Sequence, residues 1–192
     1  GRLYLFLLSD LDGKLNLDAS LLYLNETNKM EPDPEKHLPI DFYISTYGGS
    51  ADDMFALYDI MRQVKKTTEI HTIGMGKVMS AGVLLLAAGT KGKRKIGRNC
   101  RVMIHGMMGG YHGNITNMEN EIQEVKWIQE RYVESLVEES FLTEKKIKTM
   151  RQLPKVVANT EVGKKVKIKI WRNSRLISKN IVLGRLETSA EF

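Results

Sequence analysis

The stretch GMGKVMSAGVLLLAAG, residues 74–89, combines a run of small and apolar residues with a single hydroxyl, that of Ser80. Its composition predicts a buried helix, with Ser80 at the front of that helix. The first turn of a helix has unpaired backbone N–H groups and the positive end of the helix dipole. Two roles are therefore open for Ser80. It is either an N-cap that accepts hydrogen bonds from these donors, or a reactive hydroxyl whose neighbouring amides hold an oxyanion.

On both sides of this stretch, strands alternate with helices, and this alternation predicts right-handed βαβ units in an α/β fold. The expected strands cover residues 3–8, 40–46, 69–76, 93–97 and 100–106, and the expected helices cover 17–30, 51–66 and 115 to about 140. The first strand is expected to be buried. The first helix has an apolar side of Leu17, Leu21, Leu22 and Leu24, and the long helix has a stripe of Ile122, Val125, Ile128, Tyr132, Val133 and Leu136.

Two further features could carry chemistry together with Ser80. His105 follows the apolar strand CRVMI and precedes a glycine-rich segment, so it could accept a proton from a serine, although a single such histidine is more often structural. Gly48 and Gly49 follow the strand 40–46 and could present a backbone N–H to an oxyanion, or could simply form a tight turn. The other histidines (His37, His71 and His112) have no comparable setting. Each feature is weak alone, whereas their order along the chain is specific.

The bulk composition excludes several classes of protein. A chain of 192 residues with 42% hydrophobic residues suits one ordinary domain with a core. The longest apolar run is shorter than the ~20 residues that a membrane span needs. The single cysteine, Cys100, cannot form an internal disulfide, which favours a reducing compartment such as the cytoplasm. No metal or cofactor motif is expected, and the chain contains no P-loop for ATP.

The pattern changes near residue 150. RQLPKVVANT, residues 151–160, predicts a short helix, and the following residues predict two strands about a turn at Asn173 and Ser174. Residues 151–192 contain ten Lys and Arg and three Glu, and account for the positive charge of the chain. Because the lysines alternate with apolar residues, they indicate a solvated strand face rather than a nucleic-acid-binding surface.

Residues 1 to about 150 resemble the Clp-type serine protease family in three segments: YISTYGGSADDMFALYDIM, TIGMGKVMSAGVLLLAAGTKGKR and NCRVMIHGMMGGYHGN. The resemblance implies that Ser80 is the nucleophile, that His105 is the general base, and that the amides of Gly49 and Ala81 form the oxyanion hole. It also implies a ClpP/crotonase-like fold, a spiral of repeated βαβ units, in which the long helix after Asn117 is the handle where two rings meet. Proteins of this family stack as heptameric rings with the sites inside a chamber. A hexameric ATP-driven unfoldase feeds them, and their gating loops would precede Gly1.

The chain also departs from the family pattern, as a divergent, phage-like member would. Tyr47 stands where the family has proline, Gly106 and Met107 replace Gln-Pro after the histidine, and residues 77–79 are larger or more charged than usual. The third triad residue of the family is an aspartate after the handle, yet this sequence has no Asp after Asp59. Glu144 and Glu161 lie nearest in sequence to the place where the family has this aspartate, and the third member stays unassigned.

The segment from Arg151 to Glu187 resembles the last helix and two strands of a PDZ domain of the Deg/HtrA proteases. The peptide-binding loop of a PDZ domain would lie upstream of this segment, so we expect no peptide binding by the tail. The expected organisation is a Clp-protease-like domain over residues 1–150 and a partial PDZ-like segment over 151–192.

Three functions compete on this reading. The first is a serine endopeptidase subunit whose activity is weak or lost without the aspartate. The second is a non-catalytic ring subunit that keeps the handle. The third is a crotonase-like acyl-CoA enzyme that uses paired amides on a thioester carbonyl, and the presence of Ser80 and His105 argues against it.

Overall fold

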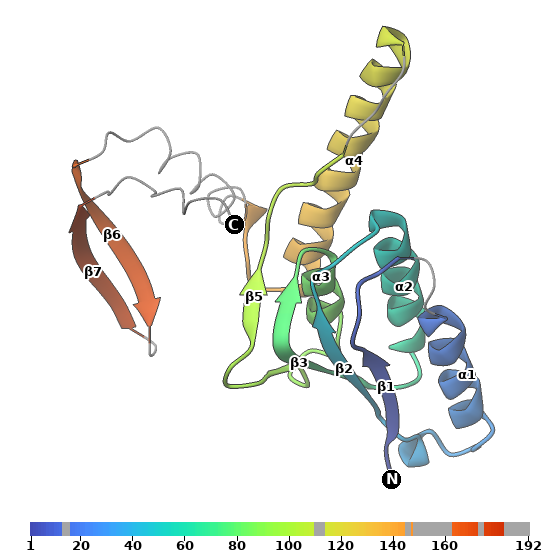
Figure 1. Cartoon of the computed structure of the whole chain (residues 1–192). Coiled ribbons are helices and arrows are strands. Elements are labelled where there is room, and N and C mark those ends of the chain that lie inside the picture. Colours follow the sequence, from blue (N-terminus) through green and yellow to red (C-terminus); the bar gives the residue numbers. More distant parts are fainter. Residues whose placement is uncertain (13–15, 110–113, 145–146, 148–162, 173–174, 183–192) are drawn as a thin grey trace, which may run out of the picture. The chain divides into compact units, whose positions relative to one another are not determined.

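A parallel sheet forms the centre of the larger of two compact units in this chain (Figure 1). The computed structural model describes residues 1–12, 16–109, 114–144, 147, 163–172 and 175–182, and the two units are Gly1–Ile147 and Lys148–Phe192. The sheet has the order β1-β2-β3-β4, and β5 also pairs with β3, all in parallel. Its strands are β1 (Leu3–Leu7), β2 (Ile40–Thr46), β3 (Ile70–Met79), β4 (Lys95–Ile96) and β5 (Arg101–Met103).

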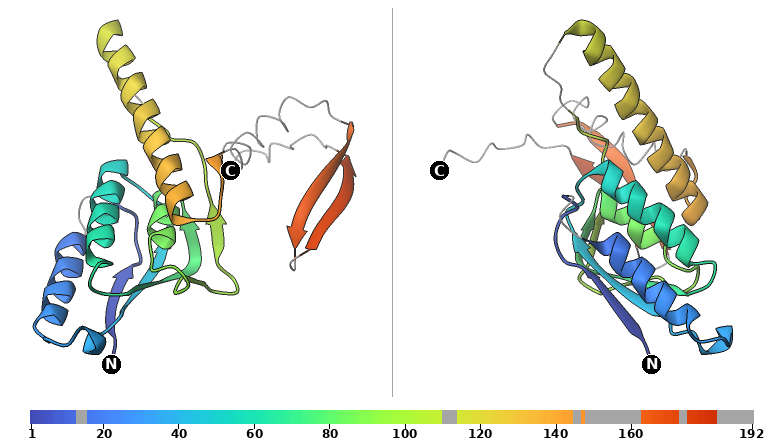
Figure 2. Two further views of the ribbon diagram at one scale, coloured as in Figure 1. Left: turned by 180° about the vertical axis from the view of Figure 1, so that it is seen from behind. Right: turned by 90° about the vertical axis from the view of Figure 1, so that its right-hand side faces the viewer.

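Helices cover one face of this sheet, as the side view in Figure 2 shows for α1, α2 and α3. The helices of this unit are α1 (Leu17–Lys29), η1 (Pro34–Lys36), α2 (Ala51–Val64), α3 (Ala81–Ala87) and α4 (Ile115–Glu139). Capping side chains fix where two of them begin. Ser50 accepts from the amide of Asp53 at the start of α2, and Asn114 accepts from that of Asn117 at the start of α4. The expected α/β fold with a parallel sheet and a long helix is confirmed.

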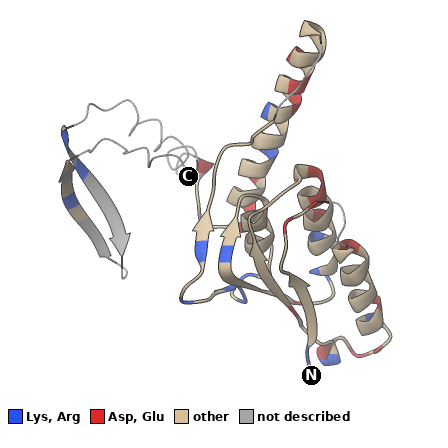
Figure 3. Ribbon diagram, in the orientation of Figure 1, with Lys and Arg blue, Asp and Glu red and all other residues tan. Residues whose placement is uncertain are grey.

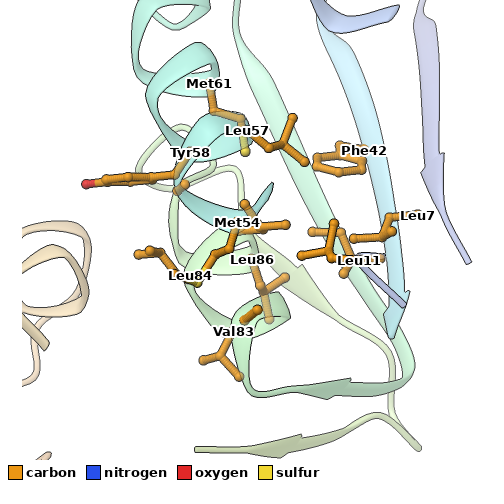
Figure 4. Packing of buried hydrophobic residues seen from close by; sticks show 14 of the residues in the cluster. Leu7, Leu11, Phe42, Met54, Leu57, Tyr58, Met61, Val83, Leu84 and Leu86 are labelled. Atoms are coloured by element: carbon orange, nitrogen blue, oxygen red, sulfur yellow. The ribbon is translucent and has the colours of Figure 1, made fainter. Parts of the chain in front are cut away.

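The core lies between the sheet and these helices (Figure 4). Alternate residues of β2 point into it, because successive strand residues face opposite sides of a sheet. The helices supply residues at helical spacing, as Met54, Leu57, Tyr58 and Met61 of α2 do. The fully buried members of the core include Leu7, Phe42, Met54, Leu57, Met61, Leu84 and Leu85.

Three expectations need correction. The strand β1 is buried on one face only, since Leu5 and Leu7 are buried whereas Tyr4 and Phe6 are exposed. The strand β3 does not end at its glycines but continues to Met79, because β5 offers it a second pairing partner there. In α1, Leu22 is partly exposed, and two asparagines occupy the buried side instead: Asn25 and Asn28.

The long helix α4 is only half integrated into the core. Tyr132, Val133 and Leu136 are buried, as the apolar stripe predicts, whereas Ile122 at the other end of the stripe is 52% exposed. The N-terminal part of α4 extends past the other helices of the unit (Figure 1). The predicted stripe is therefore correct in position, but burial decreases from its C-terminal half toward Ile122.

An ion pair fixes the C-terminal end of α4 to α2. Lys65 Nζ donates to both carboxylate oxygens of Glu139, at 3.1 and 3.2 Å, and the Tyr58 hydroxyl donates to the same carboxylate at 3.4 Å. Arg94 donates to the Glu139 carbonyl. Burial raises the pKa of Tyr58 above its ordinary value, and the negative charge of Glu139 raises it further.

The smaller unit contains an antiparallel hairpin. Its strands are β6 (Lys165–Arg172) and β7 (Arg175–Val182), and Arg172 pairs with Arg175 across the predicted turn. The two strands were therefore predicted correctly, whereas the predicted turn residues Asn173 and Ser174 and the predicted helix at 151–160 lie outside the described residues. In the described part of the chain, no helix combines the length and the apolarity that crossing a bilayer would require.

We predict that Glu139→Gln lowers the free energy of unfolding by about 1–3 kcal/mol, because it removes the charge that Lys65 and Tyr58 face in a mostly buried setting. The matched control is Glu138→Gln on the next residue. Glu138 pairs with Arg62, but the two side chains are 56% and 47% exposed, against 7% and 19% for Glu139 and Lys65. Because water screens this exposed pair, we expect Glu138→Gln to lower the free energy of unfolding by less than about 1 kcal/mol. Urea unfolding measures both, and equal losses would contradict the prediction.

Candidate active site

The Gly-Gly turn and the start of α3 meet at the edge of the sheet where β2 and β3 end. Thr46 of β2 pairs with Val78 of β3, so the segments that follow each strand begin side by side. The segment after β1 joins them. The Leu11 amide donates to the Gly48 carbonyl at 2.7 Å, and the Ser50 amide donates to the Leu11 carbonyl at 2.8 Å. This edge is where parallel α/β sheets usually carry their sites.

Both glycines of the turn are required by close approach of other backbone. A Cβ on Gly48 would lie 2.6 Å from Ser80 Cβ and 3.1 Å from the Ala81 nitrogen. A Cβ on Gly49 would lie 2.0 Å from the Leu11 carbonyl oxygen. Both residues also have positive φ, at 115° and 134°, which disfavours any side chain there. The turn therefore packs directly against the peptide that joins Ser80 to Ala81.

Ser80 has a strained backbone. Its φ of 53° and ψ of −123° lie outside the regions that non-glycine residues favour, and no other described residue except glycine has positive φ. The residue precedes the first turn of α3, but its side chain makes no capping hydrogen bond. The interpretation of Ser80 as an N-cap that satisfies the helix donors is therefore wrong. Strain of this kind gathers at functional sites, and here it presents a hydroxyl that capping does not use.

Three hydrogen bonds hold the Ser80 backbone in this conformation. Its amide donates to the Met103 carbonyl of β5 at 2.9 Å. Its carbonyl accepts from the Val83 amide at 3.0 Å and from the hydroxyl of Tyr132 at 2.8 Å. The sequence pattern identified Tyr132 only as part of the apolar stripe of α4. The phenolic oxygen distinguishes it from the other members of the stripe, but nothing in the sequence indicates what it contacts.

His105 lies two residues beyond Met103, the residue that accepts the Ser80 amide. Two residues of chain span at most ~7 Å, so the fold brings the backbones of Ser80 and His105 into the same neighbourhood. The imidazole is half-buried, and its Nδ1 lies 2.6 Å from the Gly106 carbonyl oxygen. No hydrogen bond joins His105 to Ser80 within the described residues. The backbones of the two residues therefore lie close together, but their side chains are not hydrogen-bonded to each other in this conformation.

Asp10 was not identified from the sequence, although it holds the turn in place. One of its carboxylate oxygens accepts from the Tyr47 amide at 2.8 Å and from the Thr46 hydroxyl at 3.2 Å. The available signal was its position after β1, at the same edge of the sheet.

Two of the departures from the family pattern, Tyr47 and Lys77, contact each other. Lys77 Nζ lies 4.2 Å from the centroid of the Tyr47 ring, a cation–π contact. Lys77 is also the register partner of Arg101, and Figure 3 shows basic residues on β3 and β5 beside each other. These two departures therefore form one local arrangement, and Lys77 adds positive charge to this edge.

The third triad residue has no candidate among the described residues. Glu144 is exposed, the hydrogen bond of His105 is to the Gly106 carbonyl, and Glu161 lies outside the described residues. In the same described part of the chain, no three His, Cys, Asp or Glu side chains converge as metal ligands would.

The remaining described histidines lie elsewhere. His71 is in β3, near the opposite edge of the sheet, with its ring nitrogens 3.1 Å from Asp41 and 2.9 Å from Glu69. The hydrogen bond with His71 lowers the pKa of Glu69 below its ordinary value, against the opposing effect of burial. His37 contacts two backbone carbonyls. His112 lies outside the described residues.

The parallel sheet with its crossover helices and its long α4 defines an α/β protein of the ClpP/crotonase type. The sequence model of the family "Clp protease" matches residues 9–161, and the chain belongs to that family. The match continues beyond residue 150, where the resemblance was expected to end.

Curated relatives support this assignment. ATP-dependent Clp protease proteolytic subunit 1 of Prochlorococcus marinus subsp. pastoris (strain MED4) is 38% identical over 133 residues, which cover 69% of this chain and 62% of that protein. The subunit of the same name from Prochlorococcus marinus strain MIT 9312 is 40% identical over 113 residues, which cover 59% of this chain and 53% of the relative. The chain thus spans between about half and two thirds of the length of these relatives.

We predict that Ser80→Gly is more stable than Ser80→Ala by about 1 kcal/mol in urea unfolding. Both variants lose the hydroxyl, but only glycine adopts the backbone conformation at position 80 without strain, which costs roughly 1–3 kcal/mol. The greater chain entropy of unfolded glycine offsets part of that gain. Equal stabilities, or a more stable alanine variant, would show that the backbone at this position is not strained.

Proposed function

We propose that this chain is a serine endopeptidase subunit of the Clp type that hydrolyses peptide bonds in unfolded protein or peptide substrates. The observation that supports this most strongly is the strained Ser80, whose hydroxyl is not used for capping and which adjoins the Gly-Gly turn. Family membership supports a peptidase in general. It also favours this function over an acyl-CoA enzyme.

In the proposed reaction, the Ser80 oxygen attacks the substrate carbonyl carbon while His105 accepts the hydroxyl proton. The amides of Gly49 and Ala81 then donate to the oxyanion of the tetrahedral intermediate. Collapse of this intermediate breaks the C–N bond, and His105 passes its proton to the leaving amine. Water, activated by His105, hydrolyses the acyl-enzyme and regenerates Ser80.

The geometry supports the oxyanion hole in a specific way. The Gly49 amide donates no hydrogen bond among the described residues, and Ala81 is the first residue of α3, where amides have no partner within the helix. Gly48 packs between these two positions, with its missing Cβ only 3.1 Å from the Ala81 nitrogen. Two available donors thus lie on adjacent segments beside Ser80.

We expect weak turnover. A triad aspartate orients the histidine and stabilises the imidazolium, and its loss costs on the order of 10⁴ in turnover. The Ser80 hydroxyl and His105 Nε2 must also come within hydrogen-bonding distance, because no hydrogen bond joins the two residues in this conformation. Catalytic contacts of this kind often form only when substrate is bound.

The test is labelling with a fluorophosphonate probe, together with hydrolysis of a fluorogenic peptide. We expect the unchanged chain to be labelled slowly and stoichiometrically, and Ser80→Ala to abolish the labelling. Labelling of His105→Gln should be slower than that of the unchanged chain, and peptide turnover should depend on Ser80. Ser20→Ala is the matched control, because Ser20 is an exposed serine on α1 and its loss should change nothing. Labelling or turnover that persists in Ser80→Ala would contradict the proposal.

A non-catalytic ring subunit is the second candidate. The observation that favours it is the absence, among the described residues, of any carboxylate in contact with His105. It predicts that the folded chain stays unlabelled by the probe while it assembles normally.

Assembly into stacked heptameric rings, fed by a hexameric ATP-driven unfoldase, is the proposed context. Two apolar surfaces support an assembly of copies. The outer face of β1 exposes Tyr4 and Phe6, and both rings stack on Tyr43 of β2. The N-terminal half of α4 exposes Ile115, Met118 and Ile122, beside an apolar groove of about 290 Å³ that Met107 and Val125 also line. Apolar surfaces of this extent usually mark protein contacts.

We further propose a cytoplasmic location, on the strength of the single cysteine, and a separate PDZ-like segment over residues 151–192. The division into units at Ile147 and Lys148 and the hairpin of β6 and β7 support a separate segment. The Clp family match extends to residue 161, so the two resemblances overlap over residues 151–161. We propose no peptide binding by this segment.

For the handle, we predict that Ile122→Glu converts double rings into single rings or smaller species, because it places a charge in the apolar surface of α4. Gln123→Glu adds the same charge on the adjacent, exposed position and should leave the assembly unchanged. Light scattering at micromolar concentration measures both. A wild-type monomer, or an Ile122→Glu variant that assembles like the control, would contradict the handle assignment.

A further inference from the structure

One hydrogen bond orients the His105 imidazole in this structure. Its Nδ1 lies 2.6 Å from the carbonyl oxygen of Gly106, the residue that follows it. No carboxylate and no other side chain forms a hydrogen bond or ion pair with His105 among the described residues. Gly106 is one of the positions at which the chain departs from the family pattern.

This contact determines which ring nitrogen carries the proton. A backbone carbonyl oxygen can only accept a hydrogen bond, so the Nδ1 atom must be the donor. In a neutral imidazole only one nitrogen is protonated, and the other has a lone pair. With the proton on Nδ1, the Nε2 atom is therefore the acceptor.

We propose that the Gly106 carbonyl performs the orienting part of the role that a triad aspartate performs. It holds His105 in the tautomer with the proton on Nδ1, which leaves Nε2 able to accept the Ser80 hydroxyl proton. Gly106 is thus a positioning residue that acts through its backbone. This inference rests on the proposed function of His105 as general base.

The Gly106 carbonyl can supply only a part of what a triad aspartate contributes to catalysis. A carboxylate both selects the tautomer and stabilises the positive imidazolium, whereas a carbonyl is neutral and supplies only a dipole. The chain would therefore retain a correctly oriented base with weak electrostatic support. Loss of the correct tautomer would abolish even this residual assistance.

Long-range ¹H–¹⁵N correlation spectra of the ¹⁵N-labelled full chain test the tautomer directly, at a pH at which the histidines are neutral. The chain has four histidines, and His105→Gln identifies the pattern of His105 by its loss. Sequential assignment of residues 104–107 identifies it without a variant. We expect a protonated Nδ1 and a pyridine-like Nε2. A protonated Nε2, or the averaged pattern of a free imidazole, would overturn the proposal.

Weakening the acceptor tests the cause. Replacing Met107 by its α-hydroxy analogue converts the Gly106 carbonyl from an amide into an ester, which is a poorer acceptor. We expect the tautomer equilibrium of His105 to shift by roughly two- to tenfold toward the averaged pattern, the range that one net hydrogen bond supplies. The same replacement at Met108, which is exposed, changes a different carbonyl and should leave the pattern unchanged. An unchanged pattern in the variant at position 107 would exclude the Gly106 carbonyl as the cause.

The tautomer measurement is independent of catalysis. A protonated Nδ1 in a chain that the fluorophosphonate probe does not label would support the positioning inference and contradict the peptidase proposal. A labelled Ser80 with the wrong tautomer would do the reverse. Repeating the spectra on Ser80→Ala checks that the orientation of His105 does not depend on the Ser80 hydroxyl.

Discussion

The contact between Gly48 and the Ser80–Ala81 peptide is the constraint on which the site depends. Two segments that belong to different βαβ units approach so closely that a single Cβ at position 48 would overlap Ser80 Cβ. Such an approach requires glycine on one side and a fixed, strained backbone on the other. The strain can persist because surrounding hydrogen bonds from β5, α3 and α4 hold the serine from three directions. In this arrangement the Ser80 hydroxyl makes no capping hydrogen bond, and the amides of Gly49 and Ala81 belong to the two segments that meet there.

The parallel sheet produces this contact, because parallel strands end at one edge and deliver their following segments to the same place. The bridge between Leu11 and Gly49 extends that edge beyond the end of β1, and Asp10 fixes the turn through its carboxylate. On the other side of the site, β3 continues past its glycines because it pairs with β5 there. That pairing puts the Met103 carbonyl opposite the Ser80 amide. Because His105 follows Met103 by two residues, its backbone lies close to that of Ser80.

The sequence alone predicted most of the elements of the larger unit, since hydrophobic period and glycine placement are local signals. It identified Ser80, His105 and the Gly-Gly turn as candidates through their order along the chain. It could not predict that Ser80 makes no capping bond, because capping and strained serines share the same neighbours in sequence. Nor could it predict the contacts of Asp10 and Tyr132, which depend on packing between elements that are distant in sequence. The exposed face of β1 was missed because a continuous apolar run is typical of a fully buried strand as well as of one with an apolar outer face.

The helix α4 connects the candidate site to the exposed apolar surface of its own N-terminal half. Its C-terminal half is fixed to α2 by the Glu139 carboxylate and to Ser80 by the Tyr132 hydroxyl, whereas its N-terminal half presents apolar residues to solvent. Because α4 is one continuous helix, a contact that restrains its exposed half also restrains the helix that holds the Ser80 carbonyl. The exposure of the apolar half and the restraint of the serine backbone are therefore properties of the same helix. If no carboxylate supports His105, such backbone restraint matters more, since orientation is the contribution that remains when the charge is missing.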